Sequence, residues 1–198
     1  SLSNLELAHG SLLTTDFAPD PGGAADQDLY RVAQAPFASY EVVLEAVSGD
    51  AAPDARVERL ASDGSTVLQS GTPLGTGSAG SLRFANRLAA PVDNQYVRIL
   101  GASCGTACGS DDTYRLRAYE TTGFIPRFNN SGTQLTVVLL QNPTAAPIAI
   151  HLDFWDAEGA RLLTVPDTVP AHGLVVRNTS SLAALAGASG SVTVTHDG

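Results

Sequence analysis

The chain has 198 residues, a length that suits one large all-β domain or two sandwiches of about 100 residues each. It carries 20 acidic and 11 basic side chains, and the net charge of −9 repels phosphate backbones and anionic membrane surfaces. We therefore expect no nucleic-acid partner. The sequence has no run of about 20 apolar residues, so we also expect no membrane insertion.

The first part of the chain reads as a series of short strands. Apolar and polar residues alternate, which is the period of a strand with one buried and one exposed face. The run from Asn4 to Ala8 alternates in this way, as does the S-L-L-T-T after Gly10. Asp63 and Gly64 are a hairpin signal. Further strands are expected over Tyr30–Ala33, Tyr40–Val47, Arg56–Leu60, Thr66–Gln69, Leu82–Ala85, Tyr96–Leu100 and Tyr114–Tyr119.

The order of motifs from Asp26 to Glu120 resembles the bacterial pre-peptidase C-terminal domain. The runs that carry the resemblance are D-Q-D-L-Y-R-V, Y-E-V-V-L-E-A, S-D-G-S-T-V-L, Q-Y-V-R-I-L-G and D-D-T-Y-R-L-R-A-Y-E. The resemblance implies a secreted, non-catalytic, jelly-roll-like β-sandwich over residues 1–120. The sequence contains neither an H-E-x-x-H motif nor a Walker loop. We therefore expect no enzymatic activity and no cofactor.

The texture of the sequence changes after Glu120, where we place a domain boundary. Glu158 and Gly159 form a second hairpin signal, and only Ser181–Ala186 looks helical, with Ser180 or Ser181 as the N-cap. Strands are expected over Phe124–Asn130, Gln134–Gln141, Ile148–Trp155, Arg161–Val165, Leu174–Arg177 and Ser191–His196.

The runs F-I-P-R-F-N and G-S-V-T-V-T-H-D-G resemble the immunoglobulin-like or fibronectin-like modules of exported bacterial proteins. That resemblance implies an Ig-like β-sandwich over residues 121–198. The fold class that we expect is therefore all-β, with two consecutive antiparallel β-sandwiches, the first jelly-roll-like and the second Ig-like.

The two cysteines, Cys104 and Cys108, lie in a C-G-T-A-C loop. Two thiolates are too few for a structural zinc site, which usually has four ligands. A disulfide across this short turn is sterically possible and would stabilise the fold by roughly 2 kcal/mol. We expect the disulfide, which implies an oxidising compartment and a secreted, extracellular protein.

Carboxylates gather near the start of the first strand series and before its last strand. Calcium binds six to eight oxygen ligands, and loops rich in aspartate supply them. Some members of the resembled family hold calcium near the start of the fold, which points to Asp26 and Asp28. The alternative is that these residues form turns without a metal, and we expect folding to require none. The aspartates concerned are Asp16, Asp20, Asp26, Asp28, Asp111 and Asp112.

Two groups of side chains are candidates for binding. If their strands pair, Arg98 would form a basic stripe with Arg115 and Arg117, able to engage an anionic glycan or a partner carboxylate. The alternative is cross-strand pairing with glutamates such as Glu41 and Glu45 of the same sheet. Trp155 lies beyond His151 and Asp153 on one strand face. That face could hold a sugar or a metal, or could be an ordinary polar outer face.

Two hypotheses about function are consistent with the sequence. The first is a structural or adhesive extracellular protein that self-associates, as a surface or filament subunit joined by β-strand addition. The residues proposed to donate the strand are Leu5, Leu7, Leu12 and Leu13, unless that run belongs to its own sandwich. The second is an accessory binding module that targets a secreted hydrolase to a polymer or glycan. The expected partner is a second copy, or another extracellular protein or polymer.

Overall fold

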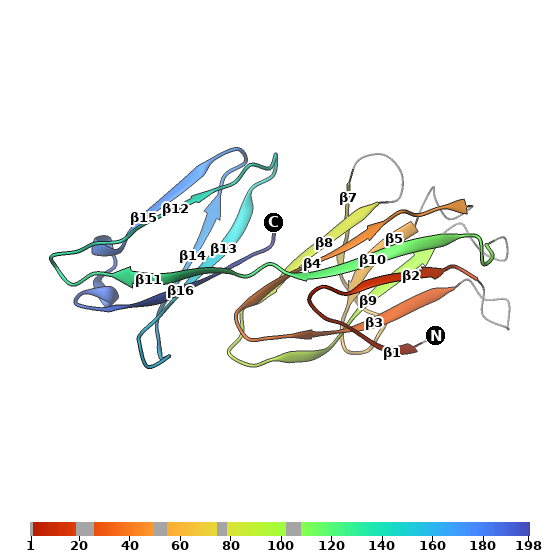
Figure 1. Cartoon of the computed structure of the whole chain (residues 1–198), viewed down its shortest axis with the longest axis horizontal. Coiled ribbons are helices and arrows are strands. Elements are labelled where there is room, and N and C mark those ends of the chain that lie inside the picture. Colours follow the sequence, from red (N-terminus) through yellow and green to blue (C-terminus); the bar gives the residue numbers. More distant parts are fainter. Residues whose placement is uncertain (1, 19–25, 50–54, 75–78, 102–107) are drawn as a thin grey trace. The chain divides into compact units, whose positions relative to one another are not determined.

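The structure is a computed structural model that describes residues 2–18, 26–49, 55–74, 79–101 and 108–198 (Figure 1). Strands form nearly all of its regular structure, so the expected all-β class is confirmed. The chain divides into two compact units. Unit 1 comprises Ser1–Pro36, Tyr40–Arg83 and Ala90–Glu120, and unit 2 comprises Phe37–Ser39, Phe84–Ala89 and Thr121–Gly198.

Unit 1 is built on two five-stranded sheets. The first has the order β1-β3-β9-β5-β6, formed by β1 (Leu2–Leu7), β3 (Gln27–Gln34), β9 (Val92–Gly101), β5 (Ala55–Leu60) and β6 (Val67–Ser70). The second has the order β2-β10-β4-β8-β7, formed by β2 (Leu12–Asp16), β10 (Thr113–Glu120), β4 (Ala38–Glu45), β8 (Gly80–Asn86) and β7 (Thr72–Pro73). Strand β1 pairs with β3 in parallel, which corrects the expectation of purely antiparallel sheets.

Side chains from both sheets form the core of unit 1. Val42 and Leu44 of β4 are buried, whereas Val43 between them is partly exposed. On β9 of the other sheet, Val97 and Ile99 are fully buried. Because successive side chains of a strand point to opposite faces, the alternation read from the sequence places one face of each sheet in the core.

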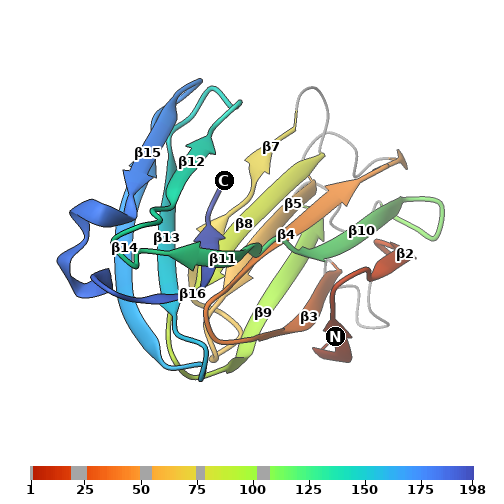
Figure 2. The ribbon, with the colours of Figure 1, turned by 60° about the vertical axis from the view of Figure 1, so that its left-hand side comes forward.

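Unit 2 has a four-stranded sheet and a two-stranded ribbon (Figures 1 and 2). The sheet has the order β11-β16-β13-β14, formed by β11 (Gly123–Asn129), β16 (Ser189–His196), β13 (Ile148–Trp155) and β14 (Arg161–Val169). The ribbon pairs β12 (Val137–Gln141) with β15 (Leu174–Asn178), which lie side by side in both views.

The core of unit 2 is centred on two phenylalanines. The rings of Phe128 and Phe154 meet edge to face, with centroids 5.2 Å apart, and both side chains are fully buried. Val138 from the ribbon and Val192 from β16 belong to the same cluster. The ribbon therefore covers the inner face of the four-stranded sheet and completes a small sandwich.

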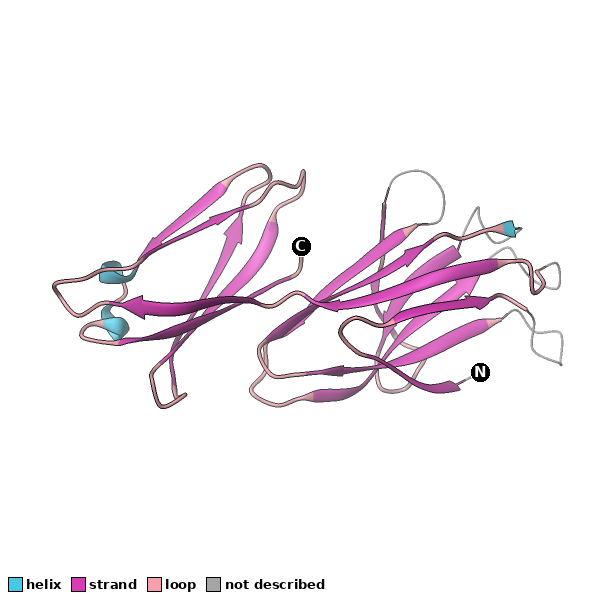
Figure 3. Cartoon of the chain, in the orientation of Figure 1, coloured by secondary structure: helices cyan, strands magenta, loops and turns pink. Residues whose placement is uncertain are grey.

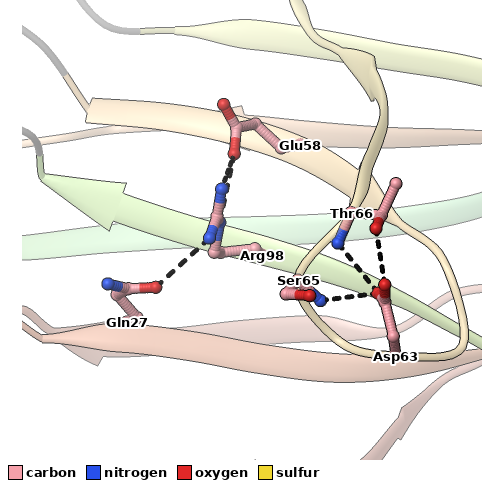
Figure 4. Close-up of polar contacts among 6 residues, drawn as sticks. All are labelled: Gln27, Glu58, Asp63, Ser65, Thr66 and Arg98. Atoms are coloured by element: carbon pink, nitrogen blue, oxygen red, sulfur yellow. Dashed lines mark hydrogen bonds and ion pairs between the residues drawn. The ribbon is translucent and has the colours of Figure 1, made fainter.

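The two expected hairpins are present. At the turn between β5 and β6, Gly64 adopts a left-handed φ of 67°. The Asp63 carboxylate accepts hydrogen bonds from the backbone N–H groups of Ser65 and Thr66, at 2.9 and 2.8 Å (Figure 4). Between β13 and β14, Gly159 has a φ of 84°. Glycine supplies the left-handed residue in both turns, since it adopts positive φ without steric cost.

The expected short helical segment near residue 181 is present as two separate turns (Figure 3). Two single 3₁₀ turns, η2 (Thr179–Ser181) and η3 (Ala183–Leu185), replace one helix, because Leu182 between them is extended at φ −102°. The N-cap is Asn178 rather than a serine, and its side chain accepts a hydrogen bond from the backbone N–H of Ser180 at 3.0 Å.

Candidate functional site

The N-terminal strands belong to the sandwich of their own chain. Strand β1 pairs with β3, and β2 pairs with β10, where Leu13 lies opposite Leu116. Leu7 is buried in the core, whereas Leu5 and Leu12 are 55% and 57% exposed. This arrangement matches the alternative in which the run forms the first strands of its own fold.

The three arginines of the proposed stripe do not come together by strand pairing. Arg98 lies on β9 and the other two lie on β10, which belongs to the other sheet, so the condition for the stripe is not met and the alternative of pairing with glutamates holds. Arg98 Nε donates to Glu58 Oε2 at 3.0 Å (Figure 4), and Arg117 Nε donates to Glu45 Oε1 at 2.6 Å. Arg115 Nη1 lies 3.4 Å from the same Glu45 oxygen. Cross-strand glutamates therefore occupy all three guanidinium groups.

A buried polar cluster lies between the sheets of unit 1. The hydroxyls of Tyr30 and Tyr114 are 2.7 Å apart, and the Tyr114 hydroxyl donates to Asp28 Oδ2 at 2.5 Å. Burial raises the pKa of Tyr30 to about 12. Burial, together with the nearby negative charge, also raises the pKa of Tyr114. The cluster is a hydrogen-bonded link between sheets rather than a reactive site.

The calcium hypothesis stays a prediction. Asp28 uses one carboxylate oxygen to bind Tyr114, and Asp20 lies outside the described residues. Within the ranges that the structure describes, no three His, Cys, Asp or Glu side chains are grouped closely enough to hold a metal. Asp112 is buried and its Oδ2 accepts a hydrogen bond from the Gly109 backbone at 2.6 Å.

The proposed disulfide is also not decided, because Cys104 lies outside the described residues. Cys108 is buried, at 4% exposure.

Two sequence motifs also match known sites, and the first is G-A-S-C-G at residues 101–105, which has the spacing of a nucleophile elbow. Residues 102–105 of this match lie outside the described residues, and the next described element is strand β10 rather than the helix that the motif requires. G-T-G-S-A-G at residues 75–80, which has dinucleotide-loop spacing, likewise leads into strand β8.

The polar face around Trp155 is held together by its own side chains. Asp153 is buried, and its Oδ1 accepts a hydrogen bond from Thr164 at 2.5 Å and lies 3.5 Å from Arg161 Nη1. The Trp155 indole N–H donates to Thr193 Oγ1 at 3.0 Å. The Asp153 carboxylate and the Trp155 indole N–H therefore both have partners within unit 2, which matches the alternative of an ordinary polar outer face.

A hollow of about 370 Å³ opens on unit 1. Three carboxylates line it, those of Glu6, Asp93 and Glu120, together with Tyr40 and His9. The His9 Nδ1 accepts a hydrogen bond from the Glu120 backbone at 3.1 Å, and burial raises the pKa of Tyr40. Apolar residues such as Pro91 and Val92 also line the hollow, and Glu6 is ion-paired with Arg31, so the remaining carboxylates make the hollow disfavour anionic ligands.

The feature that sequence reasoning missed is the outer face of the β12–β15 ribbon. Val137, Leu139, Leu174 and Val176 are all between 46% and 59% exposed on this face. Their neighbours Val138 and Val175 are buried, so the ribbon is apolar on both faces. The signal in the sequence was consecutive apolar residues, V-V-L-L and L-V-V, in place of alternation.

The chain matches no protein-family model and no curated protein. The resemblance to the pre-peptidase C-terminal domain therefore stays a prediction. Among the described residues, no helix has the length and hydrophobicity needed to cross a bilayer.

Proposed function

We propose that this protein is a non-catalytic extracellular structural or adhesive subunit that self-associates by β-strand addition. The observation that carries the proposal is the β12–β15 ribbon, a two-stranded sheet with apolar side chains exposed on its outer face. In a chain with a net charge of −9, the outward positions of these strands are occupied by aliphatic and uncharged polar residues.

The size of this surface indicates the strength of the contact. Four half-exposed aliphatic side chains offer on the order of 300 Å², comparable with the largest apolar patch of a typical monomer. A stable interface buries about 800 Å² on each partner. The aliphatic face alone therefore supports a weak contact, and backbone pairing at a strand edge must add to it.

The test is the mass of the protein in solution as a function of concentration. Light scattering is expected to show a mass that rises from the 20.4 kDa of the monomer as concentration increases. Leu139→Lys is expected to weaken association about tenfold or more, because it places a charge on the ribbon. Leu12→Lys is the matched control, since Leu12 is exposed to a similar extent on an edge strand of unit 1. A wild-type protein that stays monomeric at every concentration would refute self-association.

The second candidate function is an accessory module that holds a secreted hydrolase on a polymer or glycan. The acidic hollow beside Tyr40 and His9 favours it, because hydroxyl groups of a glycan can donate hydrogen bonds to carboxylates. Co-sedimentation with insoluble polysaccharides tests this function. Binding that is lost in Glu120→Gln but kept in Glu58→Gln, which lies outside the hollow, would support it.

A further inference from the structure

The edges of the sheets in unit 2 differ in how they are protected. Strand β11, at one edge of the four-stranded sheet, contains Pro126 and Arg127, and β14, at the other edge, contains Pro166 and Asp167. Proline lacks the N–H that a neighbouring strand would bind, and charges on an edge disfavour pairing. Both edges of that sheet therefore resist the addition of another strand.

The hydrogen bonds that flank the ribbon show which groups of β12 face outward. The Asn142 N–H donates to the Gly173 carbonyl at 2.9 Å, and the Thr179 N–H donates to the Thr136 carbonyl at 3.0 Å. Alternate residues of an antiparallel strand bond to opposite sides. Even-numbered residues of β12 therefore bond to β15, and the odd-numbered residues direct their N–H and C=O groups to the other side.

The two edges of the ribbon are not alike. On β15, the carbonyl of Val176 accepts a hydrogen bond from Arg177 Nη1 at 3.0 Å, which occupies part of that edge. On β12, the outward groups belong to Val137, Leu139 and Gln141. In the described part of the chain, β12 pairs with β15 alone. The strand has no proline and no charged residue, and residues 128–150 carry none of Asp, Glu, Lys, Arg or His.

We propose that the open edge of β12 pairs with β12 of a second copy of this chain, antiparallel and about a two-fold axis at Leu139. This inference rests on the proposed function and names the surface and the partner. In this register, Leu139 lies opposite Leu139 of the second copy, and Val137 lies opposite Gln141. All three outward-facing residues then form hydrogen-bonded pairs, each with two N–H···O=C bonds. The two ribbons become one four-stranded sheet.

A second copy suits this edge better than a different chain would. The strand V-V-L-L-Q is complementary to itself in the antiparallel register, because aliphatic residues meet at its centre. Two copies that each carry a charge of −9 repel one another, and the repulsion is smallest where an uncharged segment lies between them. The N-terminal strands are not free to be donated to a neighbour, since they already pair with β3 and β10 in their own sheets, and the edge strand β1 carries the charged Glu6.

The symmetry of the contact determines the form of the assembly. A two-fold contact is isologous and closes as a dimer. Leu174 and Val176 of both copies then lie on one continuous outer face, which stays open to a further contact. A surface layer or filament would therefore be built from dimers, through an interface other than the β12 edge.

The experiment uses two double variants of the full chain that differ in the sign of the charge at position 141. Val137→Lys with Gln141→Lys places lysines opposite each other in the proposed register, whereas Val137→Lys with Gln141→Glu places opposite charges there. Both positions are exposed, so both variants are expected to fold, which Trp155 emission and far-UV circular dichroism verify. Sedimentation is expected to show a dimer dissociation constant at least tenfold higher for the Lys/Lys variant. The Lys/Glu variant is expected to stay within about threefold of wild type.

The outcomes separate this inference from the proposed function. Equal association of the wild type and both variants overturns the β12 contact but leaves self-association standing. Equal loss of association in both variants overturns the two-fold register. A wild type that is monomeric at all concentrations overturns the proposed function and this inference together. Leu139→Cys gives an independent check, because paired Cα atoms about 5.5 Å apart permit a disulfide between copies. Leu5→Cys is its exposed control on unit 1.

Discussion

The N-terminal strands of unit 1 and the β12–β15 ribbon of unit 2 both expose leucines, yet they are built differently. Leu5 and Leu12 are as exposed as Leu139. Strand β1 also carries Glu6, which forms an ion pair with Arg31 of the neighbouring strand. Strand β12 has no charge and pairs on one side within the described residues. An exposed leucine therefore does not identify an assembly surface, whereas the protection of the strand edge distinguishes the two regions.

The largest loss of stability is expected from deletion of residues 1–14, which tests whether the N-terminal strands belong to unit 1. The deletion removes β1, most of β2 and the buried Leu7, and we expect a loss of several kcal/mol, comparable to the stability of a small domain. All five tyrosines lie in unit 1 and the single tryptophan lies in unit 2. Near-UV circular dichroism of the tyrosines should therefore be lost while Trp155 emission stays native. A truncated protein with an unchanged tyrosine signal would contradict the assignment of these strands to unit 1.

A smaller effect is expected from Leu7→Ala. Truncation of this buried side chain should lower the free energy of unfolding by about 3 kcal/mol, through lost burial and the cavity that remains. Leu5→Ala is the matched control on the same strand, and a change below about 0.5 kcal/mol is expected because Leu5 is exposed. Urea unfolding followed by the tyrosine signal gives both values. An equal loss of unfolding free energy in the two variants would show that the alternation of apolar residues along β1 does not determine which of its side chains are buried.

Alkaline pH is expected to destabilise unit 1 selectively, by about 2 kcal/mol at pH 12. The pKa of Tyr30 is raised from 10.0 to about 12, chiefly by burial. A raised pKa means that the neutral hydroxyl stabilises the fold fully below pH 10, and that this stability is lost as pH rises through about 12. Thermal unfolding between pH 8 and 12 measures the effect. The Trp155 transition of unit 2 is the internal control, and Tyr30→Phe should reduce the alkaline loss in unit 1.

Prediction from sequence succeeded where the determinant is local. The strand Ile148–Trp155 was predicted with the bounds that the structure has. The strand after the Glu158 hairpin was predicted to end at Val165 but extends to Val169, through Pro166. Proline is compatible with β14 because the strand lies at a sheet edge, where one missing N–H is not needed. Position in the sheet, which the sequence does not display, decided that boundary.

The candidate sites show the same limit. Arg98 and Arg115 are both strand residues, as predicted, but whether they share a sheet depends on the order of strands that are distant in sequence. The Asp28 interaction with Tyr114 joins residues 86 positions apart. Both strands of the ribbon were predicted, but its outer face was overlooked because its apolar residues read as core, and only the tertiary structure shows that this face is exposed.

The all-β class and the two hairpins at Gly64 and Gly159 follow from the amino-acid sequence alone. Alternation over a few residues and the positive φ that glycine permits are local properties, which act before any long-range contact forms. The tertiary structure decided that β1 runs parallel to β3, that glutamates neutralise the arginines, and that β12 has an open edge. Each of these depends on which strands become neighbours, and hydrogen bonding between distant segments settles that only when the sheets assemble.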